Sequence, residues 1–424
     1  MKKISFIGLG KLGLPLATCF AKNSYEVLAI DKNKKLIDTL KGGKAPWKEP
    51  RLADNISLAE KTITYSTSYA GVEKTDVSII LVNTPSVKKD GSFSNLYVEQ
   101  SIKSICDRLN TGSKKKHHII LSSTVMPGSI KDTFIPLIKS LTECDVTFNY
   151  VPDFVAIGKV IDDFEEPDFL LIGGETKKSI NDTRRMYKHI MKFNNTPVRE
   201  VNLAEAELCK VALNAYITTK ISFGNYLGIL SKRLDPSINV DNVTNTIGLD
   251  SRIGLKYLTA GGPYGGTCFP RDTWAFAKVS NKVGLESFHM MANEKINDNT
   301  DEDIFNQIIS VDNSAIGLVG LGFKPGTPVT TEGVASKIIR RLKNHKAKIY
   351  LFDIYPEAID NIIAEFPEYE FVDSRKHNFT LRDIVDACNS IVFCNGDKQY
   401  LQIMDDVDFY NFNTKNVIDP WRII

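Results

Sequence analysis

A cysteine set among glycines is the first feature that could carry chemistry. The stretch "GGPYGGTCFPRD", residues 261–272, places Cys268 between a flexible glycine loop and a Pro-Arg-Asp sequence. A glycine loop is costly to order and lets a ligand approach the backbone closely. Arg271 would favour the thiolate, which is the nucleophilic form of cysteine. A small buried apolar residue is the alternative interpretation of any single free cysteine.

The second candidate is the glycine pattern G-x-G-x-x-G in "IGLGKLG", formed by Gly8, Gly10 and Gly13. It follows an apolar run and precedes a helical pattern, which is the setting of a pyrophosphate-binding turn. Asp31 ends the next apolar run, where a carboxylate accepts hydrogen bonds from ribose hydroxyls and disfavours a 2′-phosphate. The pattern therefore predicts NAD rather than NADP, although lysines such as Lys35 follow closely. A purely structural turn is the alternative.

Two threonines end later apolar runs, Thr84 in "VNTP" and Thr124 in "SSTVMPG". Ligands of a doubly wound sheet lie at the carboxyl ends of its strands, so both threonines are candidates to face the cofactor. Ordinary turn chemistry explains them equally well. A nucleophilic cysteine together with NAD would oxidise an aldehyde through a thiohemiacetal to a thioester.

The elements that must position these residues follow from the hydrophobic pattern. Short apolar runs alternate with helical segments over residues 1–202, which is typical of a parallel sheet covered on both faces. Helical periodicity without proline runs from about 203 to 232 and indicates a spine that joins two lobes, and helical sequence continues to about 300. The strand pattern returns over 312–424. We therefore expect an α/β protein with two Rossmann-like doubly wound domains joined by a long central helix and a helical middle domain.

Composition narrows the functional classes. The chain has 53 basic and 51 acidic residues among 424, so no overall field attracts nucleic acid or an anionic membrane. No stretch approaches the ~20 apolar residues of a membrane helix. The seven cysteines are scattered with no CxxC pair, and the six histidines lack metal-ligand spacing, so neither a disulfide framework nor a metal site is expected. These features predict a cytoplasmic protein.

The motifs together resemble the nucleotide-sugar dehydrogenase family, the UDP-glucose and UDP-N-acetylhexosamine 6-dehydrogenases. The matching stretches lie in family order over nearly the whole chain: "ISFIGLGKLGLPLA", "VNTP", "SSTVMPGS", "AELCKVALNAYITTKISFGN", "GGPYGGTCFPRD" and "GLGFKPGTP". The resemblance implies oxidation of the sugar C6 alcohol to a carboxylate with two NAD per sugar. It also implies an N-terminal NAD domain, a C-terminal domain that holds the nucleotide, and a homodimer formed through the central helices.

The resemblance also assigns roles. It makes Cys268 the nucleophile, and Lys210 and Asn214 the groups that stabilise the oxyanion at C6. Four residues apart, the latter two share one helix face. Asp272 is the carboxylate that works with Lys210. Thr124 positions water, and Asp153 supplies the acid or base for thioester hydrolysis. The implied cofactor set is Gly8, Leu9, Gly10, Lys11, Leu12, Gly13, Asp31, Lys35, Thr84, Pro85, Thr124 and Arg271. The implied substrate set is Asp153, Phe154, Lys210, Asn214, Arg252, Tyr257, Gly261, Gly265 and Lys324, with Arg252 reaching the partner subunit.

Several positions depart from the family pattern. The usual "NPEFLREG" segment reads "VPDFVAIG", so Asp153 replaces one glutamate and Ile157 replaces another. Arg271 stands where the family has lysine, and Thr331 stands where an arginine is expected. These changes concern specificity and cofactor contacts more than the nucleophile. They indicate a divergent subgroup of the family, and the resemblance does not identify its sugar substrate.

Two other functional classes fit parts of the sequence. A β-hydroxyacid dehydrogenase shares the first domain and the long helix, but it transfers one hydride and uses no cysteine. A catalytically silent NAD-binding regulator would explain Ile157 and Thr331, but not the retention of Cys268, Lys210 and Asp272. The number of NADH molecules formed per sugar separates the three classes: two, one or none.

Overall fold

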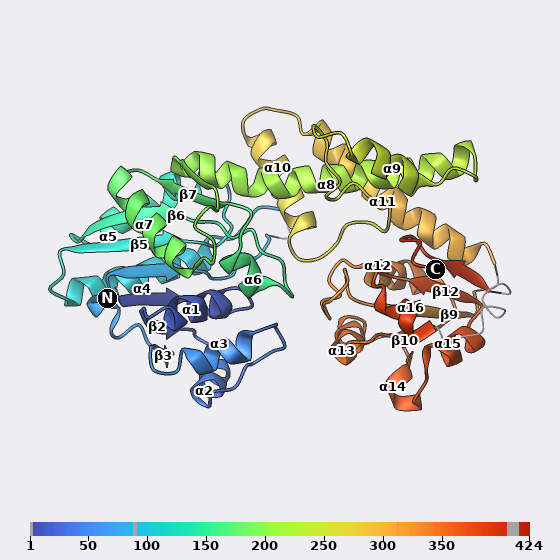
Figure 1. Ribbon diagram of the computed structural model, residues 1–424, viewed down its shortest axis with the longest axis horizontal. Helices are drawn as coiled ribbons and strands as arrows, with labels where there is room; N and C mark the ends of the chain where they lie inside the picture. The colour runs from blue at the N-terminus through green and yellow to red at the C-terminus, as the bar shows by residue number, and fades with distance from the viewer. Residues whose placement is uncertain (1–2, 88–90, 312, 405–414) are drawn as a thin grey trace. The chain divides into compact units, whose positions relative to one another are not determined.

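In the computed structural model the chain divides into two compact units, Met1–Ala212 and Leu213–Ile424 (Figure 1). The structure describes residues 3–87, 91–311, 313–404 and 415–424. The division falls inside the helix α8 (Leu203–Leu234). The presence of α8 confirms the long proline-free helix expected from the sequence. The expected division into three domains, 1–202, 203–311 and 312–424, stays a prediction.

The first unit is an α/β domain. Its strands and helices before α8 are β1 (Lys3–Ile7), α1 (Gly13–Lys22), β2 (Glu26–Ile30), α2 (Lys34–Lys41), α3 (Leu52–Leu58), β3 (Ile63–Ser66), η1 (Val72–Lys74), β4 (Val77–Ile80), α4 (Leu96–Thr111), β5 (Lys116–Leu121), η2 (Ile130–Phe134), α5 (Ile135–Leu141), β6 (Asp145–Tyr150), α6 (Val160–Glu165), β7 (Leu170–Gly174), α7 (Lys177–Ile190) and β8 (Val198–Val201).

The sheet of the first unit has the order β3-β2-β1-β4-β5-β6-β7-β8. All neighbouring strands pair in parallel except β6 and β7, which are antiparallel. The order around β1 is that of a doubly wound dinucleotide-binding sheet, whose switch point lies between β1 and β4. Successive residues of β1 enter opposite cores: Phe6 packs in the cluster with α1 and α7, and Ile7 in the cluster with α4. The sheet is therefore buried on both faces, as the apolar runs predict.

The second unit combines helices with a smaller sheet. Beyond its part of α8 it holds α9 (Val240–Gly248), α10 (Phe269–Lys282), α11 (Phe288–Ile309), β9 (Ala315–Val319), α12 (Val334–Arg341), η3 (Leu342–Asn344), β10 (Lys348–Phe352), α13 (Pro356–Glu365), β11 (Phe371–Asp373), α14 (Ser374–His377), α15 (Leu381–Ala387), β12 (Ser390–Phe393), α16 (Gln399–Met404) and β13 (Asn416–Ile418). The sheet order is β11-β10-β9-β12-β13, with every pair parallel. This confirms the expected fold of two doubly wound α/β domains with helices between them in the chain.

The two sheets share one local construction. In the first unit, the backbone N–H of Leu9 donates to Asp31 Oδ2 over 2.8 Å, which ties the loop after β1 to the end of β2. In the second, the N–H of Leu321 donates to Asp353 Oδ2 over 2.6 Å, which ties the loop after β9 to the end of β10. Both loops read Gly-Leu-Gly. A repeat of three residues is too short to indicate related domains until the strands that precede it are known.

Two further features of the described residues concern membranes and metal ions. None of the helices within residues 3–87, 91–311, 313–404 and 415–424 has the length and apolarity to cross a membrane. Among the same residues no group of three or more His, Cys, Asp or Glu side chains could hold a metal ion.

Candidate active site

The three glycines of the β1–α1 turn have different surroundings. Gly8 has φ +95°, and a Cβ there would lie 2.3 Å from the carbonyl oxygen of Leu81. A Cβ on Gly13 would lie 2.0 Å from the carbonyl oxygen of Gly8, so α1 starts in close contact with the turn. A Cβ on Gly10 would meet no atom within 4 Å. Gly8 and Gly13 therefore serve the turn itself, whereas Gly10 leaves exposed backbone that a pyrophosphate can approach. The residues fit a dinucleotide.

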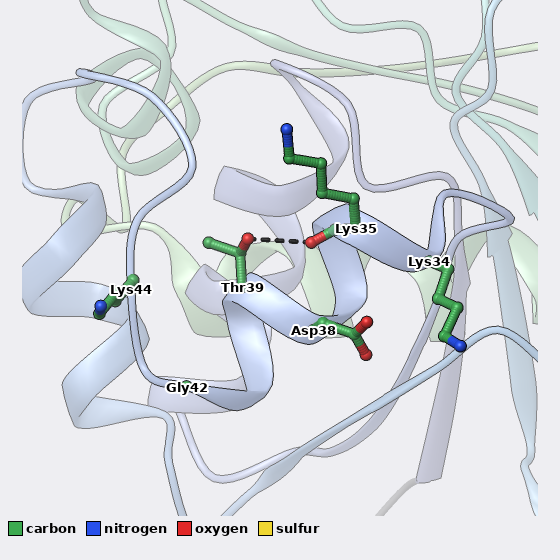
Figure 2. Close-up of a pocket in the computed structure, with 6 residues that line it drawn as sticks. All are labelled: Lys34, Lys35, Asp38, Thr39, Gly42 and Lys44. Carbon is green, nitrogen blue, oxygen red and sulfur yellow. Dashed lines mark hydrogen bonds between the residues drawn. The ribbon is translucent and has the colours of Figure 1, made fainter.

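Asp31 fits the ribose end of the same site. Its Oδ2 accepts from the N–H of Leu9 and its Oδ1 from the N–H of Asn33, both over 2.8 Å. These two bonds fix the carboxylate, and each oxygen keeps a further lone pair for a ribose hydroxyl. Lys35 lies on the exposed first turn of α2. Figure 2 shows the hollow beside this helix, where the side chains of Lys34 and Lys35 point in different directions.

The two candidate threonines meet at the carboxyl ends of β4 and β5. Thr84 Oγ1 donates to the carbonyl oxygen of Thr124 over 2.6 Å, and Thr84 is buried. One residue earlier, the Ser123 hydroxyl bonds both backbone groups of Val82, each over 2.8 Å. The ends of two adjacent strands are thus locked together beside the switch point. Pro85, the next residue in the chain, accepts the backbone N–H of Ser94.

Helix α8 brings Lys210 to the segment after β6. Lys210 Nζ donates to the backbone carbonyl of Asp153, and it lies 4.8 Å from the centroid of the Phe154 ring. Asp153 is buried, and its Oδ2 has no hydrogen-bond partner among the described residues. Burial raises the pKa of this carboxyl to about 7, while the nearby Lys210 cation opposes the rise. An acid of this kind changes protonation near neutral pH, as a catalytic base or acid must.

Glu207 is a residue of this region that the sequence analysis missed. It lies one turn before Lys210 on α8 and is buried. Its two carboxylate oxygens accept the backbone N–H groups of Gly128 and Ile130, each over 2.9 Å. The loop that carries Thr124 is therefore attached to α8. The glutamate of "AELCK" is the available sequence signal, but its partners lie more than 70 residues away in the chain.

In the second unit, Asn214, Asp272 and Arg271 form one hydrogen-bonded group. Asn214 Nδ2 donates to Asp272 Oδ2 over 2.5 Å, and Arg271 Nε donates to Asp272 Oδ1 over 3.0 Å. Asp272 is fully buried, so each carboxylate oxygen needs such a donor. Cys268 is exposed at the N-cap of α10, and its backbone carbonyl accepts the N–H of Asp272. Cys268 therefore lies one helical turn before Asp272, the residue that pairs with Asn214.

The remaining predicted residues have partners of their own. Arg252 is exposed and pairs with Asp250 over 2.6 Å. Tyr257 has φ +65° and packs edge-on against Phe269, next to Cys268. The ammonium of Lys324 lies 5.8 Å from the centroid of the Phe323 ring.

The other members of the predicted cofactor and substrate sets have varied surroundings. Gly261 faces Trp421, and Gly265 lies against the backbone of Glu332. Leu12 packs on the core with α1, and Lys11 is exposed.

These features define an NAD-dependent oxidoreductase: a doubly wound sheet with a dinucleotide turn, and an exposed cysteine beside a buried amide–carboxylate pair. Family models agree with this class. The NAD binding domain of the UDP-glucose/GDP-mannose dehydrogenase family matches residues 2–191, and the central domain of that family matches residues 204–299. The chain belongs to the UDP-glucose/GDP-mannose dehydrogenase family, and its cofactor is NAD.

Relatives and solved structures match over nearly the full length. The chain is 30% identical to UDP-glucose 6-dehydrogenase AglM of Haloferax volcanii, over 100% of this chain and 97% of the relative. It is 27% identical to GDP-mannose 6-dehydrogenase of Pseudomonas putida, over 96% and 97%. The structure of a UDP-glucose dehydrogenase from Pyrobaculum islandicum matches with a TM-score of 0.90 at 26% identity, over 100% of this chain and 95% of that one.

Proposed function

We propose that the protein oxidises the C6 hydroxyl of UDP-glucose, or of a closely related nucleotide sugar, to a carboxylate in two successive oxidations. The observation that carries the proposal is Cys268, an exposed thiol at the start of α10 in a chain whose first unit is an NAD-binding domain. The similarity to the UDP-glucose dehydrogenases of Haloferax and Pyrobaculum supports UDP-glucose as the substrate. The retained thiol argues against single-hydride chemistry and against a silent regulator.

The cofactor would be held by the β1–α1 turn, by residues that follow β2, β4 and β5, and by Arg271. NAD, when bound, accepts a hydride from C6 in each oxidation. Gly10 leaves room for the pyrophosphate, and Asp31 offers acceptors to the ribose. The proposed set is Gly8, Leu9, Gly10, Lys11, Leu12, Gly13, Asp31, Lys35, Thr84, Pro85, Thr124 and Arg271.

The chain's own groups carry the covalent steps. Cys268 Sγ bonds to C6 of the aldehyde, and the aldehyde oxygen receives a proton to complete the thiohemiacetal. Loss of that proton and of a hydride from C6 leaves a thioester. Lys210 and Asn214 would stabilise the negative charge that develops on the C6 oxygen. Asp272 would hold Asn214 by the observed bond and act with Lys210.

Water then cleaves the thioester. Attack at C6 breaks the C–S bond, releases the carboxylate and returns the Cys268 thiol. We assign Asp153 as the base that takes a proton from this water, because its raised pKa of about 7 gives it both protonation states near neutral pH. Thr124 would position the water.

The substrate would be bound by Asp153, Phe154, Lys210, Asn214, Arg252, Tyr257, Gly261, Gly265 and Lys324. Two departures from the family bear on specificity. Thr331 accepts the backbone N–H of Gly266 over 2.9 Å, so its main chain holds the cysteine loop even without an arginine side chain there. Ile157 supplies no carboxylate at its position.

A panel of UDP-, GDP- and TDP-sugars assayed for NADH formation tests the proposal. UDP-glucose should give the highest kcat/KM, with two NADH formed per sugar consumed. A preference for GDP-mannose would change the proposed substrate but leave the proposed mechanism unchanged. Formation of one NADH per sugar, or of none with any member of the panel, would contradict the proposal.

We also propose that the protein is a cytoplasmic homodimer. Large apolar side chains are exposed along the helices of the second unit: Tyr216, Phe223, Tyr226 and Leu234 on α8, Trp274 on α10, and Phe288 and Met291 on α11. Exposed apolar side chains in this number favour an interaction site, and a second copy of the chain offers matching apolar side chains. All seven cysteines are free, which suits a reducing compartment.

A further inference from the structure

The backbone that leads to Cys268 is held on both of its polar groups by one buried amide. Asn225 lies on α8 and is only 2% exposed. Its Oδ1 accepts the N–H of Gly261 over 2.8 Å, and its Nδ2 donates to the carbonyl of Gly262 over 3.0 Å. A carboxamide can make this pair of bonds in only one orientation, so the side chain fixes both the place and the direction of the loop.

An indole ring closes the glycine side of the same loop. A Cβ on Gly261 would lie 2.7 Å from Trp421 Nε1, and a Cβ on Gly262 would lie 2.4 Å from Trp421 Cη2. From sequence alone, glycines at these positions suggest the close approach of a ligand. At Gly261 and Gly262 the close neighbour is Trp421, which leaves no room for a side chain.

A second amide holds the loop closer to the thiol. Asn297 lies on α11 and is 3% exposed. Its Oδ1 accepts the N–H of Tyr264 over 2.7 Å, and its Nδ2 donates to the carbonyl of the same residue over 3.3 Å. Two different helices thus hold the loop backbone at two points, which lie four to seven residues before Cys268.

We propose that Asn225 and Asn297 are positioning residues that hold the glycine loop so that Cys268 reaches C6 in one geometry. This inference rests on the proposed function. Free glycines would leave the loop many conformations, and the two amides remove that freedom before substrate arrives. A displacement of about 1 Å at a reacting atom can cost about a hundredfold in rate. Neither amide needs to touch the substrate, because both act through the backbone.

The rates of the two oxidations distinguish a positioning role of these amides from a general loss of structure. The first oxidation converts the C6 alcohol to an aldehyde and forms no bond to sulfur. The second begins when Cys268 Sγ adds to C6. A displaced thiol therefore slows the second oxidation and spares the first, whereas general damage to the fold slows both.

The test compares Asn225→Asp and Asn297→Asp with Asn306→Asp, which makes the same change at an exposed position of α11. Each Asp variant keeps the acceptor and loses the donor to the loop. Chemical quenching at millisecond times, with UDP-glucose and NAD, measures aldehyde captured as its oxime and acid formed. NAD affinity and melting temperature are measured in parallel.

In the two loop variants we expect the aldehyde to form within about threefold of the wild-type rate and the acid about tenfold to a hundredfold more slowly. NAD affinity should be unchanged, and Asn306→Asp should match the wild type. Equal loss of both oxidations, or no loss of either, would overturn the inference. Asn297→Asp tests it from a different helix if Asn225→Asp fails to fold. A wild-type enzyme that makes no acid, or a Cys268→Ala enzyme that makes acid normally, would instead overturn the proposed function.

Discussion

Residue

At the scale of single residues, the assigned chemistry depends on charged groups that are buried. Asp153 is the clearest case: it is buried, one of its oxygens lacks a partner among the described residues, and its pKa is raised to about 7. Asp272 is equally buried but has donors on both oxygens. The two carboxyls therefore differ in environment, which is how one protein assigns different tasks to similar groups.

Asp153 should make folding stability fall as pH rises. Its pKa is about 7 in the folded protein and near 3.8 when exposed, so the folded state binds more protons between these values and loses stability as pH increases through that range. Asp153→Asn removes this cost, so at pH 8 it should raise the free energy of unfolding by about 2–4 kcal/mol. Below pH 4 it should change little. Urea denaturation at both pH values measures the effect, and a variant that is equally stable or less stable at pH 8 would contradict the assignment.

Lys210 should matter for turnover more than for binding. Lys210→Ala should lower kcat by about two to three orders of magnitude, the size expected for the loss of one oxyanion stabiliser. The substrate KM should change much less, because the negative charge develops in the transition state. Steady-state kinetics measures both. Turnover close to that of the wild type would remove Lys210 from the mechanism.

Element

At the scale of elements, the β1–α1 turn separates structural glycines from a ligand-facing one. Gly8→Ala and Gly13→Ala place a Cβ within 2.3 Å of a carbonyl oxygen and should destabilise the first unit by about 2 kcal/mol or more. Gly10→Ala meets no atom, so its melting temperature should stay close to that of the wild type while NAD affinity falls. Calorimetry and NAD titration give the two readouts. Unchanged NAD affinity in Gly10→Ala would contradict the placement of the pyrophosphate.

Helix α8 also fixes the loop that carries Thr124, through Glu207. Glu207→Gln keeps one acceptor but turns an amide donor toward a backbone N–H, so the variant should lose about 1–3 kcal/mol of stability. Hydrogen exchange should quicken at Gly128 and Ile130 in particular. Glu302→Gln, at an exposed position of α11, is the matched control. Unchanged protection at those two amides would show that the carboxylate does not hold the loop.

Local pattern predicted most of the elements and part of the site. The long helix α8 was predictable because helical periodicity continues without proline. The closeness of Cys268 and Asp272 was predictable because the two residues are only four apart in the chain. The antiparallel pairing of β6 and β7 was not predictable, since it depends on a non-local choice. The contact of Asn225 with Gly262 joins residues 37 apart, and Trp421 lies some 160 residues from the loop it covers. No local pattern encodes such contacts.

Whole molecule

At the scale of the whole chain, residues 2–191 match the NAD binding domain of the family, and Cys268 lies in the second unit. The exposed apolar side chains of the helical segment add the expectation of a dimer. Sedimentation should give a dimer for the wild type and a monomer for the double variant Phe223→Asp, Tyr226→Asp. Leu58→Asp, at an exposed apolar position of α3, should leave the mass unchanged. A monomeric wild type would contradict the dimer.

The central claim is that oxidation passes through a covalent bond between C6 and Cys268. Intact-protein mass spectrometry of Asp153→Asn, incubated with NAD and UDP-glucose, tests it most directly, because loss of the base should stall the thioester before hydrolysis. We predict an adduct of the acylated nucleotide sugar, mapped by peptide analysis to Cys268 and absent when Cys268→Ala is added. An adduct on any of the other six cysteines, or full-rate acid formation by the Cys268→Ala enzyme, would contradict the account.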